Sequence, residues 1–347
     1  MKTVLFCMNP YSFGILEPIM QVLREKKYEY IWFVRETILE KFPFKDEKFT
    51  TSIQDIVRFQ SDAIFIPGNE VPYYLRGVKT QVFHGLAGEK KGHFRIRSYF
   101  DLYLTQGPYF TKWFSKAAIK HKNFSVVETG WPKLDIYGKE LHKYDEDKQN
   151  LLFSSNAKKI ILFAPTFSPS LSSAPHLSTQ IEELASHKDY FIMIKFHDLM
   201  AVDLIALYKE LSNKFVNVLF VEERNIIKYL LIADLLISDT SSVVYEFLLL
   251  DKPVITFKNN SKNLNWDNSF TYDGLVNKVF VNLTEDPFKE NRANILNEYH
   301  PYTDGNSALR MVDAVEAYIE ENTVPEKRVI SWFRKYKINK MFGKIDI

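Results

Sequence analysis

The sequence predicts an α/β protein built from two successive domains, each with a parallel sheet. Short apolar runs of strand length alternate with helical patterns along the chain, and this alternation favours parallel sheets covered by helices. The alternation stops once, in a polar stretch near the middle of the chain, and then starts again. A length of 347 residues exceeds the usual size of one hydrophobic core, so two domains are expected.

The first series of elements occupies roughly the first 130 residues. A loop containing Asn9, Pro10 and Gly14 follows the first strand and leads into a helix over about Ile15–Lys26. The expected strands are Lys2–Met8, Tyr30–Val34, Ala63–Ile66, Gln81–Phe83, Tyr103–Thr105 and Ser125–Glu128.

The polar, charged segment Tyr137–Asn156 has no strand signal and is the expected interdomain connection. After it, helices are expected over about Asn225–Ile232 and Ser242–Leu250. We therefore expect Rossmann-like domains at residues 1–145 and 155–322, facing a cleft, and a tail at residues 323–347. The expected strands of the second domain are Lys159–Phe163, Phe191–Phe196, Val218–Val221, Leu235–Ile237 and Val254–Phe257.

The composition is ordinary for a globular protein, with 46% hydrophobic and 25% charged residues. A net charge of +2 gives no global attraction to nucleic acid, so no such partner is expected. The single cysteine, Cys7, excludes an intrachain disulfide or a thiolate metal cluster, and it predicts a small core residue in a reducing compartment. Without a secretory signal or an apolar run of membrane-spanning length, a cytoplasmic location is expected.

Small polar or imidazole groups follow predicted strands at four places. They are His84-Gly85, Thr166, His197 and the turn from Asp239 to Ser242. Ligands of open parallel sheets bind beyond the carboxyl ends of the strands. The pattern therefore predicts a binding site built from strand ends.

His84 lies in the segment QVFHGLAGEKKGHF. The adjacent Gly85 and the nearby Gly88 would let the backbone approach a ligand, and Lys90 and Lys91 could hold a phosphate. An imidazole titrates near neutral pH and is a natural general base, which typically contributes roughly 10²–10⁴-fold in rate. The alternative is a core histidine beside a flexible loop.

A second group of candidates lies in the second half. Lys195 and His197 share a face if their strand continues, and both could donate to phosphate oxygens. The alternative is a surface lysine with a histidine paired to Asp198. The turn from Ser238 to Ser242 precedes an apolar helix whose first N–H groups and dipole suit phosphate. The alternative for this turn is a plain capped helix.

Several common catalytic motifs are not present in the sequence. It contains no GxGxxG, no GxxxxGK[ST] and no GxSxG. The other histidines follow no HExxH or similar ligand spacing, so neither a metal nor a cofactor is expected. Phosphate binding would rest on helix N-termini and hydroxyl groups.

The tail from Lys327 to Lys344 carries seven Lys/Arg and no acid, interleaved with aromatic residues. Such a basic, aromatic, amphipathic segment is typical of an anchor on an anionic membrane surface. The alternative is a final helix that packs its apolar face on the body. On a helix, one side would carry Val329, Trp332, Phe333, Tyr336 and Met341.

Taken in order over residues 78–310, the motifs resemble those of the CDP-glycerol glycerophosphotransferase family, which makes teichoic acid type polymers. Three positions depart from the family pattern: Phe83 replaces a tryptophan, Phe167 follows the third motif in place of a basic residue, and Asp198 replaces a proline. The motifs are Phe83-His84-Gly85, Thr129-Gly130-Trp131-Pro132-Lys133-Leu134-Asp135, Phe163-Ala164-Pro165-Thr166, Lys195-Phe196-His197-Asp198, Ser238 to Pro253, and Asp304-Gly305-Asn306-Ser307 with Arg310.

The resemblance implies a GT-B-like fold and transfer of an alditol phosphate from a CDP-linked donor to a hydroxyl of a lipid-linked glycan, with release of CMP. His84 would be the general base, and Glu246 would hold the ribose hydroxyls. The implied catalytic role of His197 is to stabilise charge on the pyrophosphate. The donor side would further comprise Thr166, Lys195, Ser238, Asp239, Thr240, Ser241 and Ser242.

This function places the protein peripherally at the inner face of the plasma membrane. Two other functions stay open. One is a glycosyltransferase of the same architecture that uses a nucleotide sugar. The other is a non-catalytic member that binds a nucleotide or scaffolds polymer assembly, which the departures at Phe167 and Asp198 suggest.

Overall fold

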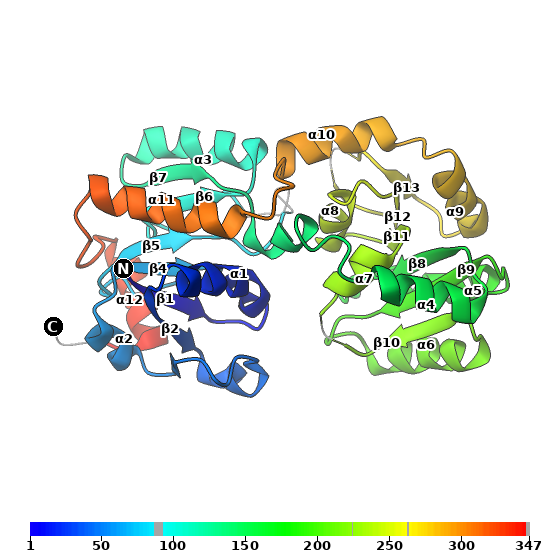
Figure 1. The fold of residues 1–347 in the computed structure, drawn as a ribbon, viewed down its shortest axis with the longest axis horizontal. Helices are drawn as coiled ribbons and strands as arrows, with labels where there is room; N and C mark the ends of the chain where they lie inside the picture. The colour runs from blue at the N-terminus through cyan, green and yellow to red at the C-terminus, as the bar shows by residue number, and fades with distance from the viewer. Residues whose placement is uncertain (87–92, 224, 262–263, 345–347) are drawn as a thin grey trace. The chain divides into compact units, whose positions relative to one another are not determined.

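The structure is a computed structural model that describes residues 1–86, 93–223, 225–261 and 264–344. The chain divides into two compact α/β units (Figure 1). The first unit combines Met1–Lys139 with Glu298–Ile347, and the second is Glu140–Asn297. The expected division gave residues 155–322 to the second domain and set the tail apart, whereas in the structure the chain returns to the first unit at Glu298.

The first unit is built on a parallel sheet with the strand order β3-β2-β1-β4-β5-β6-β7. Its central strands are buried on both faces, which is why they appear in the sequence as continuous apolar runs. The strands are β1 Lys2–Cys7, β2 Glu29–Val34, β3 Phe49–Thr50, β4 Ala63–Ile66, β5 Val78–Gln81, β6 Leu102–Thr105 and β7 Ser125–Glu128. The helices are α1 Ser12–Glu25, η1 Glu36–Lys41, α2 Ile53–Phe59, α3 Pro108–His121, η2 Pro132–Tyr137, α11 Ser307–Glu321 and α12 Trp332–Phe342.

The second unit repeats this plan with the strand order β10-β9-β8-β11-β12-β13, again in parallel. Its core lies between the sheet and helices α5, α6 and α9. The strands are β8 Lys159–Phe163, β9 Tyr190–Lys195, β10 Val218–Val221, β11 Leu235–Ser238, β12 Val254–Phe257 and β13 Asp267–Ser269. The helices are α4 Asp145–Ser155, α5 Ala174–Ala185, α6 Val202–Lys214, α7 Ile227–Ile232, α8 Val243–Leu248, α9 Leu275–Thr284 and α10 Lys289–Tyr299.

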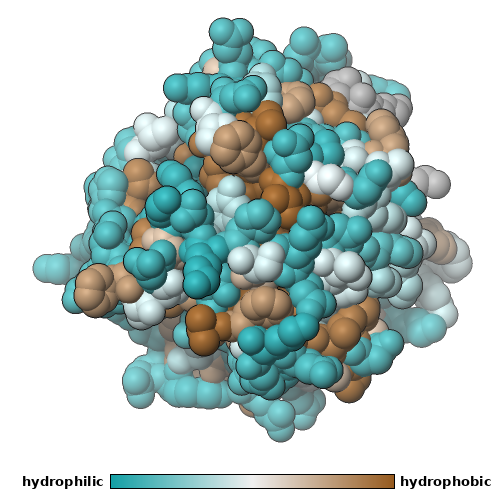
Figure 2. Space-filling model, turned by 90° about the vertical axis from the view of Figure 1, so that its right-hand side faces the viewer, coloured by the Kyte–Doolittle hydropathy of each residue, from teal (hydrophilic) through white to brown (hydrophobic). Residues whose placement is uncertain are grey.

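At the end of the second unit that carries α5 and α9, apolar side chains come to the surface between polar ones (Figure 2). A shallow cavity on this end is lined by Leu275 and Phe280 of α9 and by His187 after α5. Phe280 is 54% exposed.

The predicted strands differ from the structure at the interior strand β5 and at the two edge strands β3 and β13. Ala63–Ile66 and Ser125–Glu128 are strands with the predicted bounds, whereas β5 begins at Val78, before the predicted Gln81–Phe83. Lys79 interrupts the apolar run of β5, so the sequence pattern did not indicate a buried strand there. Its side chain is nevertheless buried, with the amine donating to the Leu75 carbonyl at 2.6 Å. The short edge strands β3 and β13 were not predicted.

Cys7 is a buried core residue, as predicted, and its burial raises the pKa of the thiol.

The return of the chain to the first unit depends on Asp135 in η2. Its carboxylate accepts the backbone N–H groups of Ser307 and Ala308, both at 2.8 Å, and so caps the start of α11. Arg310 on the next turn donates through Nε to the Thr129 carbonyl at 2.8 Å. Two of the sequence motifs, the one ending at Asp135 and the one around Ser307, therefore fasten α11 to the first unit.

Helix α12 packs on the first unit through a side different from the predicted one. Ile338 is fully buried, and the ring of Phe342 lies 5.9 Å from that of Phe6. Lys337 pairs with Glu70 at 2.7 Å. The predicted apolar side instead faces outward, since Val329, Trp332, Phe333, Tyr336 and Met341 are 88%, 79%, 70%, 59% and 41% exposed.

Within the described part of the chain, none of the helices combines the length and the apolar character needed to cross a bilayer.

Candidate active site

His84 lies in the first unit at the carboxyl edge of the sheet, just after β5. Its Nδ1 lies 2.9 Å from the carbonyl oxygen of Pro67, which follows the neighbouring strand β4. Because a carbonyl can only accept, Nδ1 carries the proton of this bond, and Nε2 holds the lone pair of the neutral ring. The side chain is exposed, so the alternative of a buried core histidine is wrong.

The residues around His84 fix the orientation of its ring. Gln81, almost fully buried, donates to the same Pro67 carbonyl at 3.2 Å. Phe83 has a φ of +59°, in the left-handed region that a bulky residue rarely adopts. This conformation buries the Phe83 ring against Phe114, at 5.0 Å between centroids, and turns the next residue outward.

Tyr11 is a site residue that the sequence did not indicate. It lies in the loop after β1, and its ring stacks on that of His84 with 5.1 Å between centroids. The amide of Asn9 donates to its hydroxyl at 3.1 Å. Since β1, β4 and β5 are neighbours in the sheet, the strand-end rule applied to the Asn9-Pro10-Tyr11 loop could have identified it.

Of the predicted contacts near His84, Gly85 is partly exposed, and its carbonyl accepts from the Gln106 side chain at 3.0 Å. Among the described residues, none comes within 4 Å of the position that a Cβ would take at Gly85. Lys90 and Lys91, predicted to hold phosphate, lie outside the described residues.

In the second unit, Asp239 holds together the loops that follow β8 and β11. Its carboxylate accepts the backbone N–H groups of Thr166 and Ser173, both at 2.8 Å, and the Ser173 hydroxyl at 2.9 Å. Burial raises the pKa of this carboxyl to about 6, against the opposing effect of these donors. Asp239 is 0% exposed, so it shapes the donor loop from beneath and does not present its carboxylate to a ligand.

Ser238 has a similar structural role. It is also fully buried, and its hydroxyl donates to the Ala164 carbonyl at 2.7 Å. Asn259, which the sequence did not indicate, donates to the backbone carbonyl of Asp239 at 2.8 Å. Of the predicted donor turn, the residues that are partly exposed and can contact a ligand are therefore Thr240, Ser241 and Ser242.

Helix α8 follows this turn and is short and buried. Ser242 stands at its N-cap position, and its side chain makes no cap hydrogen bond. Glu246 is 5% exposed and lies on the inner side of α8. Glu246 is therefore not a surface carboxylate.

His197 lies just beyond β9, beside the loop that follows β8. Its ring centroid is 4.5 Å from that of Phe167, and its Nδ1 accepts the backbone N–H of Leu199 at 3.1 Å. Nε2 therefore carries the proton in the neutral ring and can donate. Partial burial lowers the pKa of His197, an effect that Asp198 opposes.

Lys195 does not share the outward direction of His197. Strand β9 ends at Lys195, so the two-residue alternation lapses there. The Lys195 amine donates to the Phe196 carbonyl at 2.7 Å, and burial lowers its pKa. The alternative of a surface lysine is also wrong, because Lys195 is 7% exposed.

Strand order explains which candidates the structure brings together in the second unit. β8 lies between β9 and β11, so Thr166, His197 and the turn after β11 gather at one edge of the sheet. Hydroxyls and an N–H donor from imidazole suit an anionic ligand there. Among the described residues, no group of three or more His, Cys, Asp or Glu could hold a metal ion.

Residues 76–317 match the family model of CDP-Glycerol:Poly(glycerophosphate) glycerophosphotransferase. The chain belongs to this family. It is 26% identical over 237 residues to the teichoic acid glycerol-phosphate primase of Bacillus subtilis (strain 168), covering 65% of this chain and 60% of the relative. It is 30% identical over 254 residues to the teichoic acid ribitol-phosphate polymerase TarL of Staphylococcus aureus (strain NCTC 8325 / PS 47), covering 65% and 43%. The chain thus spans about half the length of these curated relatives.

Solved structures support the fold of this glycerophosphotransferase family member. The wall teichoic acid polymerase TagF superposes with a TM-score of 0.65 at 18% identity, covering 92% of this chain and 89% of that one. UDP-GlcNAc 2-epimerase from Neisseria meningitidis, bound to UDP-GlcNAc, gives 0.66 at 14% identity, covering 91% and 100%. With a parallel sheet in each of two units, the fold is GT-B-like, as the sequence predicted.

Proposed function

We propose that this chain transfers an alditol phosphate, most directly glycerol phosphate, from a CDP-linked donor to a hydroxyl of a lipid-linked or polymeric glycan. CMP would be released, and the product would be a teichoic acid type polymer of the cell surface. The family match over residues 76–317, which includes both histidine motifs, carries this proposal.

In the proposed reaction His84 acts as the general base. Nε2 takes the proton of the acceptor hydroxyl, and the acceptor oxygen forms a bond to the phosphorus of the alditol phosphate. The bond between that phosphorus and the oxygen of CMP breaks, and CMP leaves with the bonding electrons. The Pro67 carbonyl supports this role, because it holds the proton on Nδ1 and so keeps Nε2 basic.

The proposed donor site lies in the second unit. Thr166, Thr240, Ser241 and Ser242 would bind the diphosphate, with His197 donating from Nε2. Phosphoryl transfer depends mainly on positioning and on stabilising charge, so these donors suffice without covalent help. Ser238 and Asp239 would act from beneath, by holding the loops in place, and Lys195 and Glu246 are nearly buried beside them.

A release assay with matched variants tests this proposal. The protein is incubated with CDP-glycerol, CDP-ribitol or UDP-sugars and a glycan acceptor, and release of CMP or UDP is followed. His84→Ala should lower CMP release by about 10²-fold or more. The control is His121→Ala, which removes an exposed histidine from the end of α3.

Each contrary result has a distinct meaning. Parental CMP release by His84→Ala would reject the base role. UDP release from a sugar donor, with none of CMP, would favour the glycosyltransferase. Donor binding without any turnover would favour the scaffold.

We also propose that the protein works peripherally at the inner face of the plasma membrane. The outward side of α12 supports this, because Trp332, Phe333 and Tyr336 are exposed next to the cations of the tail. Vesicles with anionic lipid should retain the protein at low salt, and deletion of residues 327–347 should release it.

A further inference from the structure

A cavity of about 430 Å³ opens in the first unit where β1, β2 and β3 end. Its lining does not include His84 or Pro67, which follow β5 and β4. Met8, Arg35 and Thr51 come directly after the three strands, and Met341 and Phe342 come from the end of α12. The position is where open parallel sheets bind ligands.

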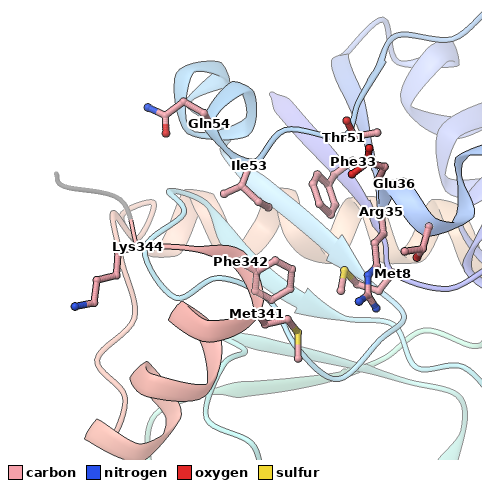
Figure 3. Close-up of a pocket in the computed structure, with 11 residues that line it drawn as sticks. Met8, Phe33, Arg35, Glu36, Thr51, Ile53, Gln54, Met341, Phe342 and Lys344 are labelled. Atoms are coloured by element: carbon pink, nitrogen blue, oxygen red, sulfur yellow. The ribbon is translucent and has the colours of Figure 1, made fainter.

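The cavity wall combines apolar side chains with the polar Thr37, Thr51 and Gln54, and cationic side chains lie at its ends. In Figure 3, Phe33 of β2, Ile53 at the start of α2, and Phe342 and Met341 of α12 surround the space. The wall from α12 is held in place, since the Tyr74 hydroxyl donates to the Gly343 carbonyl at 3.0 Å. This construction suits an apolar chain.

Arg35 lies at one end of the cavity and Lys344 at the other (Figure 3). Neither side chain makes a hydrogen bond or ion pair with another described residue, although Glu36 also lines the cavity. Both side chains are exposed and can move toward a ligand. An arginine and a lysine with apolar surface between them suit a phosphate that is attached to an apolar chain.

The cavity is lined by the end of α12, the helix that also carries the outward aromatic side. Met341 belongs to both, being 41% exposed while it lines the cavity. From there Tyr336, Phe333 and Trp332 extend along the helix toward its start. A lipid resting on this surface would therefore lie on the same helix that supplies one wall of the cavity.

We propose that this cavity binds the phosphate of a lipid phosphate, with Arg35 as its main cation and the apolar walls covering the first part of the lipid chain. This inference rests on the proposed function, in which the acceptor is lipid-linked. It adds the place where the lipid end of that acceptor is held.

Sheet geometry supports the assignment. In the strand order, β2 and β5 are three positions apart, and Arg35 follows β2 while His84 follows β5. At the usual strand spacing this separation is about 14 Å. A short oligosaccharide can bridge it, so a lipid phosphate near Arg35 would leave room for a glycan whose hydroxyl reaches His84.

The test is a calorimetric titration of the whole chain with farnesyl monophosphate below its micelle concentration, with inorganic phosphate and farnesol as comparison ligands. Farnesyl monophosphate should bind. Each comparison ligand should bind at least about tenfold more weakly, because inorganic phosphate lacks the apolar chain and farnesol lacks the phosphate. Arg35→Gln should lower the affinity for farnesyl monophosphate about tenfold. Met341→Ser should also lower the affinity for farnesyl monophosphate, but it should not change the affinity for inorganic phosphate.

Trp332→Ser is the matched control, because Trp332 lies on the same helix but outside the cavity. It should leave the affinity for farnesyl monophosphate unchanged. The proposal is overturned if Trp332→Ser weakens binding as much as Arg35→Gln does, or if Arg35→Gln has no effect. Equal binding of inorganic phosphate and farnesyl monophosphate would also overturn it.

The titration contains no CDP-linked donor, so its failure would leave the CMP-release result standing. Failure of the CMP-release assay would, in turn, leave a positive titration standing.

Discussion

Replacing Asp239 by alanine would show how far the donor loop depends on one buried carboxylate. In Asp239→Ala the N–H groups of Thr166 and Ser173 lose their acceptor. Each buried donor left without a partner costs about 1–3 kcal/mol, so these two amides predict a loss of about 2–6 kcal/mol in the free energy of unfolding. The loops after β8 and β11 should also separate, and the affinity for CDP-glycerol should fall.

The same variant should change the pH dependence of stability. Burial raises the pKa of Asp239 from an ordinary value of 3.8 to about 6 in the folded protein. An acid whose pKa rises on folding stabilises the folded state most below its unfolded pKa, and this contribution is lost as the pH rises through the folded pKa. Between pH 5 and pH 7.5 the loss is about 1.4 kcal/mol. The destabilisation by Asp239→Ala should therefore be about 1.4 kcal/mol larger at pH 5.

Urea unfolding at the two pH values measures both effects, and hydrogen exchange of β9 peptides assigns the transition to the second unit. The control is Asp234→Ala at the other end of β11, where the carboxylate accepts the Ile160 N–H at 2.8 Å and pairs with Lys148 at 2.7 Å. This control should lower stability but leave the affinity for CDP-glycerol intact. If Asp239→Ala unfolds at the parental urea concentration, or if its destabilisation is the same at both pH values, the reasoning is wrong.

Two further substitutions probe single contacts. Gly107→Ala would place its Cβ 2.5 Å from the Tyr299 carbonyl oxygen, so it should lower the melting temperature of the first unit by an amount equivalent to about 1–3 kcal/mol. Gly68→Ala, whose Cβ would have no described residue within 4 Å, should leave the melting temperature unchanged. Phe167→Ala should raise the pKa of His197 toward its ordinary 6.5, because it uncovers the ring; an NMR titration that finds an unchanged or lower pKa would contradict this.

Burial determines how much of the fold could be predicted from the sequence. The central strands are buried on both faces, so their apolar runs mark them clearly, as in Ala63–Ile66. Strand β13, Asp267–Ser269, is a polar edge strand that gains its partner only from β12. The return of α11 to the first unit was also unpredictable, because it rests on contacts of Asp135 with residues 172 and 173 positions away.

The candidate site could likewise be predicted from the sequence only in part. Strand ends correctly gave the location of His84, Thr166, His197 and the turn after β11, because parallel strands bring their carboxyl ends to one edge. The direction of each side chain is a tertiary property that the pattern does not contain. Asp239, which the sequence placed among ligand contacts, is therefore found beneath the loop.

The departures from the family pattern bear on donor affinity more than on the base. Phe167 stands where a basic residue often follows the motif, and Asp198 stands where a proline is usual; both lie beside His197. Together they remove one positive charge and add one negative charge near the proposed diphosphate, which weakens its electrostatic attraction. The surroundings of His84 keep the Pro67 contact that sets its tautomer. Within the proposed mechanism, these changes should therefore raise KM for the donor and leave proton transfer at His84 intact.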